Sequence, residues 1–506
     1  MQPKRSSTGE LLIACLRWAT IAVCFGSIAL VFGVIALRLS YPYQLEWMEG
    51  AVLQHIHVVQ SGRVPYSEPS ILFSPFFYTP LFYYVSAAVM LLTGDGFLGP
   101  RLVSIGASMA SAALVYALVR GEKGDKLAAL CGCAFFAASY WPTGRWFDLA
   151  RVDSLYVFFA LAGAFAIRHG RHPAWPFAAG LLFCLACLTK QTAAVIALPL
   201  FAWCLAFRPR ELLRLIGSFT VFSLAAFAWL QWSSDGWFGY CMFGLSSGHP
   251  LKARGVETFL LRDLALQIPI ALTLIAAAVV VGRREWPRSA SQGFLLALVA
   301  GGVIASFVIR IKVGAWTNNL MPAYAVLAVA FGVAVARLRA LPQTKFRLPD
   351  IALVLVGLQL LFMLPFASPW KWVPTTADRA AGDRLVELIA SVEGDVLVPT
   401  ATHLAERVGK AGWAHFMNVR DVQLSSRSRR QEEKLLGQFG DALRSGKFDL
   451  ILLHNPQRDY FVRLPAEYEY RGRVFPPGVF EPTSGSTLFV PAYLYVRRGV
   501  AIDRME

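Results

Sequence analysis

Long apolar runs separated by short polar links fill the first 367 residues of the chain. Runs of about 18 or more residues recur there, starting with residues 11–37, and the thickness of a bilayer makes each one a candidate membrane-spanning helix. From Ser368 onward, polar and charged residues are mixed with apolar ones. We therefore expect a transmembrane module at residues 1–367 and a separate domain at residues 368–506.

The C-terminal region combines short apolar runs with one amphipathic segment. GDVLVPT (394–400), FDLILLH (448–454) and LFVPAYLYVRR (488–498) predict strands, whereas RRQEEKLLGQFGDALRSG (429–446) predicts an amphipathic helix. This pattern is typical of a small α/β domain.

Arg and Lys residues are concentrated in alternate links. Lys4, Arg5 and Arg17 place the N-terminus in the cytoplasm by the positive-inside rule. Later basic links lie near residues 120, 168, 208, 282 and 337. If these are all cytoplasmic, the links near residues 141, 188, 233 and 310 are external.

One apolar run must then fail to cross the membrane. Residues 71–93 and 98–119 both precede the first of these basic links, and two crossings would place that link outside. Residues 71–93 contain SPFFYTPLFYY, whose prolines and aromatic cluster are typical of an interfacial helix. We therefore expect residues 39–97 to form a long external loop with juxtamembrane helices. About eleven spans then place the C-terminal domain outside.

Composition agrees with a polytopic α-helical membrane protein. Hydrophobic residues make up 56% of the chain, and the mean hydropathy is +0.50. The net charge of +16 lies largely in links between apolar runs, which indicates membrane topology and argues against nucleic-acid binding. The first run is too long for a cleavable signal peptide and lacks a small-residue cleavage site, so we expect it to stay as an anchor.

Carboxylates gather on two of the predicted external links. Glu46 and Glu49 follow the first run in YPYQLEWMEG, and a helical segment would place both on one face. Asp148 and Arg151 precede Asp153, which begins an apolar run where an ionisable residue is costly and suggests function. The alternatives are headgroup-level charges in the first link and an ion pair of Asp153 with Arg151 in the second.

Cations and amides occupy two further external links. Lys190 lies in CLTKQTAAV, and Lys312, Asn318 and Asn319 lie in RIKVGAWTNNLMP. Together the links suit a reaction in which a carboxylate takes a proton from an acceptor while cations hold a departing phosphate. A membrane substrate with a phosphate headgroup fits this set.

In order and topology these motifs resemble the C-type glycosyltransferase superfamily. The resemblance is especially to its bacterial branch related to protein mannosyltransferases and aminoarabinose transferases, glycosyltransferase family 39-like proteins. It spans roughly residues 10–340. Members carry an acidic pair in the first external loop, then a G-x-x-x-Y stretch and an aromatic juxtamembrane helix, which GRVPY and FFYTPLFYY match. Asp153 in RVDSL matches a second acid, and Lys312, Gly314 and Asn318 or Asn319 match a late Lys-Gly-Asn pattern.

The resemblance implies an inverting glycosyltransferase in the bacterial inner membrane. It would use a polyprenyl-phosphate sugar on the extracytoplasmic face, with a lipid, polysaccharide or protein as acceptor. Glu49 or Glu46 would be the base, and Asp153 would help to place the acceptor or the base. Residues for binding the donor phosphate or the substrate would be Lys190, Arg151, Asp148, Lys312, Asn318 and Asn319.

The acidic pair is incomplete, because Met48 stands where relatives carry Asp. Glu49 alone lines up with the pair and is slightly preferred as the base. A non-catalytic assembly protein with the same fold is one alternative that Met48 raises. A lipid or polysaccharide transporter or flippase is another, although no internal repeat is visible.

No resident cofactor is expected. Two carboxylates near a phosphate could hold Mg²⁺ or Mn²⁺, yet this family branch usually works without a metal. His403, His415 and His454 are far apart in sequence, and we expect structural or surface roles for them rather than metal ligation.

Overall fold

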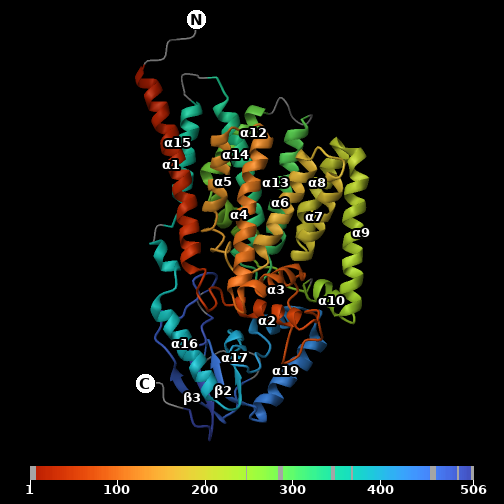
Figure 1. Cartoon of the computed structure of the whole chain (residues 1–506), viewed down its shortest axis with the longest axis vertical. Coiled ribbons are helices and arrows are strands. Elements are labelled where there is room, and N and C mark those ends of the chain that lie inside the picture. The colour runs from red at the N-terminus through yellow and green to blue at the C-terminus, as the bar shows by residue number, and fades with distance from the viewer. Residues whose placement is uncertain are drawn as a thin grey trace.

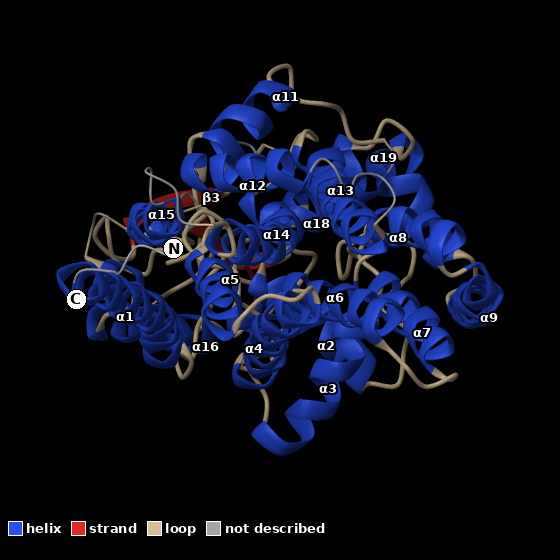
Figure 2. Ribbon diagram, turned by 90° about the horizontal axis from the view of Figure 1, so that it is seen from above, coloured by secondary structure: helices blue, strands red, loops and turns tan. Residues whose placement is uncertain are grey.

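The computed structural model describes residues 7–246, 248–282, 289–342, 348–365, 368–455, 463–486 and 489–502. An upright helical bundle is stacked on a smaller mixed domain, which covers one end of the bundle (Figure 1). The first helix starts at the bundle end remote from that domain. Seen along the bundle, α1 and α9 lie at opposite edges and α14 lies inside (Figure 2).

The bundle helices are α1 (Ser7–Arg38), α4 (Leu98–Gly121), α5 (Lys126–Ala138), α6 (Asp153–His169), α7 (Trp175–Thr189), α8 (Ala193–Phe207), α9 (Pro209–Ser233), α12 (Pro269–Gly282), α13 (Ala290–Arg310), α14 (Met321–Arg339) and α15 (Leu348–Met363). Shorter segments join them: α2 (Glu49–Gln60), α3 (Leu81–Thr93), α10 (Trp237–Gly239), η1 (Tyr240–Leu245), α11 (Gly255–Glu257), η2 (Thr258–Ala265), η4 (Thr317–Leu320) and η5 (Pro369–Trp372).

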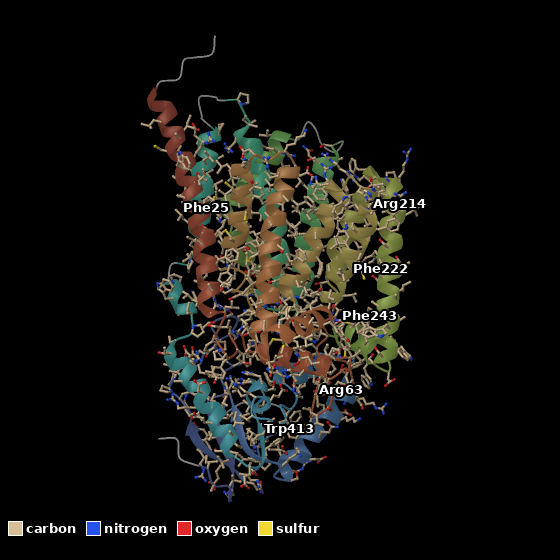
Figure 3. All side chains as sticks on the ribbon, viewed as in Figure 1. Phe25, Arg63, Arg214, Phe222, Phe243 and Trp413 are labelled. Atoms are coloured by element: carbon tan, nitrogen blue, oxygen red, sulfur yellow. The ribbon has the colours of Figure 1, made fainter. Side chains whose placement is uncertain are left out.

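The outer surface of the bundle is apolar. Phe25 on α1 and Phe222 on α9, two helices at the edges of the bundle (Figure 3), are 58% and 45% exposed. Such continuous apolar exposure is unfavourable in water and is matched by lipid hydrocarbon. By contrast α14, apolar on all sides, is 89% buried over its most apolar stretch. The chain is therefore a membrane protein.

Helix length does not establish the predicted eleven spans. Among the described residues, five helices are long and apolar enough to cross a membrane, or six if the bent pair Gly255–Ala265 and Pro269–Gly282 counts as one span. The helices α5, α7 and α8 have 13, 15 and 15 residues. At about 1.5 Å per residue they reach roughly 20–23 Å, less than the roughly 30 Å of a bilayer core.

Irregular backbone continues where the short helices end. Residues 139–152 link α5 to α6 and are mostly buried inside the protein. Non-helical backbone at membrane depth is tolerated where protein covers it or where it lines a cavity. The run at residues 71–93, for which a helix without a crossing was predicted, contains only α3, which lies at the bundle end next to the mixed domain (Figure 1).

The C-terminal domain contains the predicted small sheet. Its elements are α16 (Thr376–Ser391), β1 (Asp395–Leu397), α17 (His403–Glu406), α18 (Phe416–Leu424), α19 (Arg429–Arg444), β2 (Phe448–Leu453), β3 (Tyr468–Arg473) and β4 (Tyr493–Arg497). The strand order is β1-β2-β4-β3, with β1 and β2 parallel and the other pairs antiparallel. The strand β3 was not predicted, because at this sheet edge its side chains are mostly exposed and polar.

The first loop of the bundle, residues 39–97, contacts the C-terminal domain directly. Gln54 Nε2 donates to the Trp413 carbonyl at 2.8 Å, and Asn418 Nδ2 donates to the Ser74 carbonyl at 2.6 Å. The Trp47 ring stacks on Phe489, with 3.9 Å between centroids. The domain thus closes the bundle end where the predicted external links meet.

Candidate functional site

A cavity of about 1130 Å³ lies between the bundle end and the C-terminal domain. Residues of the first loop, of α8 and α13, and of α18 line it. Of the nine predicted site residues, six line it: Glu46, Arg151, Lys190, Lys312, Asn318 and Asn319. Asp153, Glu49 and Asp148 do not.

Asp153 lies behind the cavity wall and holds groups that line it. Its Oδ1 accepts hydrogen bonds from Lys190 Nζ at 2.7 Å and from Asn318 Nδ2 at 3.1 Å. Its Oδ2 accepts one from Trp146 Nε1 at 3.0 Å. Lys190 Nζ also donates to Asn319 Oδ1 at 2.9 Å. Asp153 is fully buried, and its ion pair is with Lys190, whereas the sequence had suggested Arg151 as the alternative partner.

Two breaks in helical structure bring these side chains together. The helix α7 ends at Thr189, and Lys190 adopts extended backbone before α8 begins at Ala193. The 3₁₀ turn η4 carries both asparagines directly before α14. In a continuous helix, successive side chains point in different directions around the axis. The two breaks instead let Lys190 and both asparagines point toward Asp153 and the cavity.

Glu46 lies in the link between α1 and α2. It is 1% exposed, and its Oε2 accepts a hydrogen bond from the Met48 N–H at 3.2 Å. Arg151 Nη1 lies 3.8 Å from the same oxygen. Burial raises the pKa of Glu46 to about 7, because desolvation and the nearby Glu49 outweigh the attraction of Arg151. Near neutral pH this carboxyl group can therefore both accept and release a proton.

Glu49 is equally buried, but both of its oxygens are occupied. Arg101 donates to them from Nε at 3.1 Å and from Nη2 at 2.8 Å. The backbone N–H groups of Leu45 and Ala150 donate at 2.5 and 2.7 Å. Burial alone would raise the pKa of Glu49, but Arg101 and the backbone donors outweigh it and lower that pKa.

The two glutamates do not share a helix face. The helix α2 begins at Glu49, so Glu46 lies before it. Because Arg101 and backbone groups occupy Glu49, the pair does not offer two free carboxylates to a divalent cation. Among the described residues, no group of three or more His, Cys, Asp and Glu side chains is placed to hold a metal ion.

Asp148, predicted to bind substrate or phosphate, pairs instead with a residue at the end of α1. Its Oδ2 lies 2.8 Å from Arg38 Nε, and both side chains are almost fully buried. The structure does not bring Asp148 to the cavity, because this ion pair joins α1 to the link before α6.

Lys312 lies at the edge of the cavity and is partly exposed. Its Nζ donates to the Ser246 carbonyl at 3.1 Å. A backbone bridge pairs Lys312 with Leu251, and the Val313 N–H donates to the Pro250 carbonyl at 2.8 Å. The links after η1 and after α13 are thereby joined on one side of the cavity.

Sequence reasoning missed several residues that line the cavity. Tyr78 accepts a hydrogen bond from Arg151 Nη2 at 3.4 Å, and its ring centroid lies 5.7 Å from Lys190 Nζ. The FFYTP motif could have indicated Tyr78. His249 and Asp421 also line the cavity, but no motif marks them and α18 was not predicted.

The three singled-out histidines have different surroundings. His403 and His415 are buried in the contact between the first loop and the C-terminal domain, where His415 Nε2 lies 3.1 Å from the Trp47 carbonyl. His454 lines the cavity.

Comparison with known proteins places this geometry in context. Residues 75–232 match the family model described as dolichyl-phosphate-mannose-protein mannosyltransferase. Two crystal structures of ArnT from Cupriavidus metallidurans, one bound to undecaprenyl phosphate and one in the apo state, are similar with TM-scores of 0.51 and 0.50. Each is 15% identical, covering 80% of this chain and 86% of ArnT. AglB from Archaeoglobus fulgidus gives a TM-score of 0.49 at 12% identity, covering 86% and 69%. No curated protein matches the sequence.

Proposed function

We propose that this chain, whose fold is that of the C-type glycosyltransferase superfamily, transfers a sugar from a polyprenyl-phosphate donor to a cell-envelope acceptor. The observation that carries the proposal is the buried carboxyl group of Glu46, which shares a cavity with four cationic side chains, those of Arg151, Lys190, Lys312 and Arg420. Burial raises the pKa of this group to about 7. The crystal structure of the similar ArnT with undecaprenyl phosphate supports a lipid-phosphate donor. The acceptor class, lipid, polysaccharide or protein, stays open.

Glu46 is the proposed general base. It takes the proton of an acceptor hydroxyl group, whose oxygen attacks the anomeric carbon opposite the phosphate. The carbon–oxygen bond to the phosphate breaks, and its electron pair leaves with the lipid phosphate, so the anomeric configuration inverts. A base pKa near the working pH favours this transfer.

Glu46 is preferred to Glu49, reversing the preference drawn from the sequence. Glu46 lines the cavity and has one backbone donor, whereas Glu49 is enclosed by Arg101 and backbone donors. Met48, where relatives carry Asp, also lines the cavity. Glu46 therefore supplies, two residues earlier, a carboxylate that Met48 cannot.

Lys190, Arg151 and Lys312 are proposed to stabilise the leaving phosphate. Asp153 acts through Lys190 and Asn318 as a positioning residue, because it contacts these two side chains and does not line the cavity. Asn318 and Asn319 complete the donor site. No resident metal is assigned a role.

The proposed orientation puts the site on the extracytoplasmic face of the bacterial inner membrane. Arg214, in the second turn of α9, lies toward the bundle end remote from the C-terminal domain (Figure 3). By the positive-inside rule that end faces the cytoplasm. Because the ionisable site residues gather at the other end rather than along a path through the bundle, a transferase is favoured over a transporter.

The test uses the full chain in lipid nanodiscs. Donors are undecaprenyl-phosphate sugars, and acceptors come from a membrane extract. Glu46→Gln is expected to lower turnover by about 10²- to 10⁴-fold, as loss of a general base does, and to leave undecaprenyl-phosphate affinity unchanged. Wild-type turnover should rise with pH through about 7, where Glu46 deprotonates, and the variant should lose this limb.

Two further variants complete the design. Lys190→Met should weaken binding of undecaprenyl phosphate, whereas Glu68→Gln, which changes an exposed carboxylate of the same loop paired with Lys434, should change neither quantity. Undiminished turnover in Glu46→Gln would reject the base assignment. Absence of undecaprenyl-phosphate binding by the wild type would reject the donor class.

A further inference from the structure

Two buried polar side chains on the cavity wall have no part in the proposed mechanism. Asp421 on α18 is 1% exposed, and His249, in the link after η1, is 9% exposed. Both line the cavity. Asp421 Oδ1 and His249 Nε2 lie 3.8 Å apart, beyond hydrogen-bond distance, and neither atom has a hydrogen-bond partner among the described residues. Unpartnered polar atoms are rare inside proteins, so they indicate a missing partner.

Burial shifts the pKa of both groups in the direction that favours the neutral form. Burial raises the pKa of Asp421 well above its usual value, although Arg151 and Arg420 act in the opposite direction. Burial lowers the pKa of His249. A protonated carboxyl group and a neutral imidazole each carry one donor and one acceptor, which suits hydroxyl groups better than charged groups.

The pair lies next to the proposed phosphate site. The backbone bridge between Leu251 and Lys312, and the hydrogen bond from Lys312 Nζ to the Ser246 carbonyl, hold the His249 segment against Lys312. A group attached to a phosphate at Lys312 would therefore lie beside the segment that carries His249. In a glycosyl phosphate, that group is the sugar.

We propose that Asp421 and His249 form a subsite that binds uncharged hydroxyl groups of the donor's sugar. This inference rests on the proposed function, because the donor phosphate brings the sugar to the subsite. It assigns a share of donor recognition to the C-terminal domain. It also predicts that the sugar is neutral at these positions, neither an amino sugar nor a uronic acid.

The test compares affinities of the full chain in nanodiscs for bare undecaprenyl phosphate and for undecaprenyl phosphate carrying neutral, amino or uronic sugars. The wild type should bind one of the neutral sugar lipids more tightly than the bare lipid. Asp421→Leu and His249→Leu should each weaken that binding by about 3- to 10-fold, the worth of one hydrogen bond. Their affinity for the bare lipid should not change.

Matched variants separate recognition from structure. Asp421→Asn keeps a donor and an acceptor and should retain the sugar preference. Asp441→Leu removes an exposed carboxylate of the same domain and should have no effect. Because Leu removes an unpaired buried polar atom, Asp421→Leu should unfold no earlier than the wild type in a thermal melt.

The outcomes distinguish this inference from the function on which it rests. If the wild type binds bare undecaprenyl phosphate but Asp421→Leu and His249→Leu keep full affinity for the sugar lipids, the inference is overturned and the proposed function stands. A wild-type preference for an amino or uronic sugar lipid, or for none, also overturns it. If the wild type binds no undecaprenyl phosphate, both fall.

Discussion

Glu46 and Glu49 differ in their partners rather than in their burial. Both are excluded from water, which favours the neutral carboxyl group. Glu49 receives a guanidinium and backbone N–H groups and stays ionised, whereas Glu46 has one backbone donor and a distant Arg151. Glu49 therefore stabilises the first loop, whereas Glu46 faces the cavity with fewer partners.

Glu49→Gln is expected to destabilise the protein. Arg101 also donates to the Tyr41 and Tyr43 carbonyls at 2.6 Å each, so it joins α4 to the chain after α1. Removing one partner of a buried ion pair leaves the other charge uncompensated, at a cost of about 3–5 kcal/mol. Thermal unfolding in detergent measures this, with Glu68→Gln as the control. A Glu49→Gln protein that is as stable as the wild type but inactive would return the role of base to Glu49.

At the scale of elements, a short C-terminal segment shapes the surroundings of Glu46. The Ser484 N–H donates to the Leu45 carbonyl at 2.9 Å, and Arg145 Nε donates to the Thr483 carbonyl at 2.9 Å. Gly485 has a φ of +68°, and a Cβ there would lie 3.1 Å from Glu46 Cγ. Glycine thus permits both the backbone turn and the close approach that keeps water from Glu46.

Gly485→Ala is expected to lower turnover by about 10- to 100-fold, because a displaced catalytic group loses its geometry. The matched control is Gly478→Ala, which has a φ of +86° and no neighbouring atom within 4 Å of an added Cβ. Both changes carry similar backbone strain, about 1–2 kcal/mol, but only the first touches Glu46. Equal turnover in the two variants would show that this contact does not position the base.

At the scale of the whole molecule, the C-terminal domain is held to the first loop by polar contacts as well as by apolar packing. His57 on α2 lies 3.1 Å from Glu406 Oε2 on α17 and 2.8 Å from Asp95 Oδ1. Burial lowers the pKa of His57, but the hydrogen bonds with Glu406 and Asp95 outweigh it and raise that pKa to about 9. This contact between the two domains therefore depends on protonation.

The stabilisation from His57 should depend on pH. Since the pKa in the folded protein exceeds the ordinary value of 6.5, the contribution is complete below about 6.5 and is lost as pH rises through about 9. Thermal melts of the wild type and His57→Gln should differ at pH 6 and converge by pH 10. A His172→Gln control, at an exposed position, should follow the wild type throughout. A constant difference between wild type and His57→Gln would contradict the assignment.

The apolar pattern of the sequence determined the type and approximate position of several helices and strands. It predicted a helical membrane module, a long apolar first helix, the strands β1, β2 and β4, and the helix α19. That residues 71–93 do not cross the membrane stays a prediction. The resemblance to the C-type glycosyltransferase superfamily, stated from short motifs, agrees with the family-model match over residues 75–232 and with the fold shared with ArnT. Burial in lipid or in a core imposes a periodicity that is visible in the residues themselves. The span count stayed a prediction, because irregular backbone replaces helix near the cavity.

Only the tertiary structure decided how the charged residues are paired. Composition and spacing brought forward Glu46, Glu49, Asp148 and Asp153, and the resemblance slightly favoured Glu49 as the base. Contacts between different elements of the chain then assigned Arg101 to Glu49, Arg38 to Asp148 and Lys190 to Asp153. Those contacts also left Glu46 in the cavity and brought Asp421 and Gly485 to it from the other domain. A buried charge is governed by the partners that folding provides, and no local pattern encodes partners so distant in the chain.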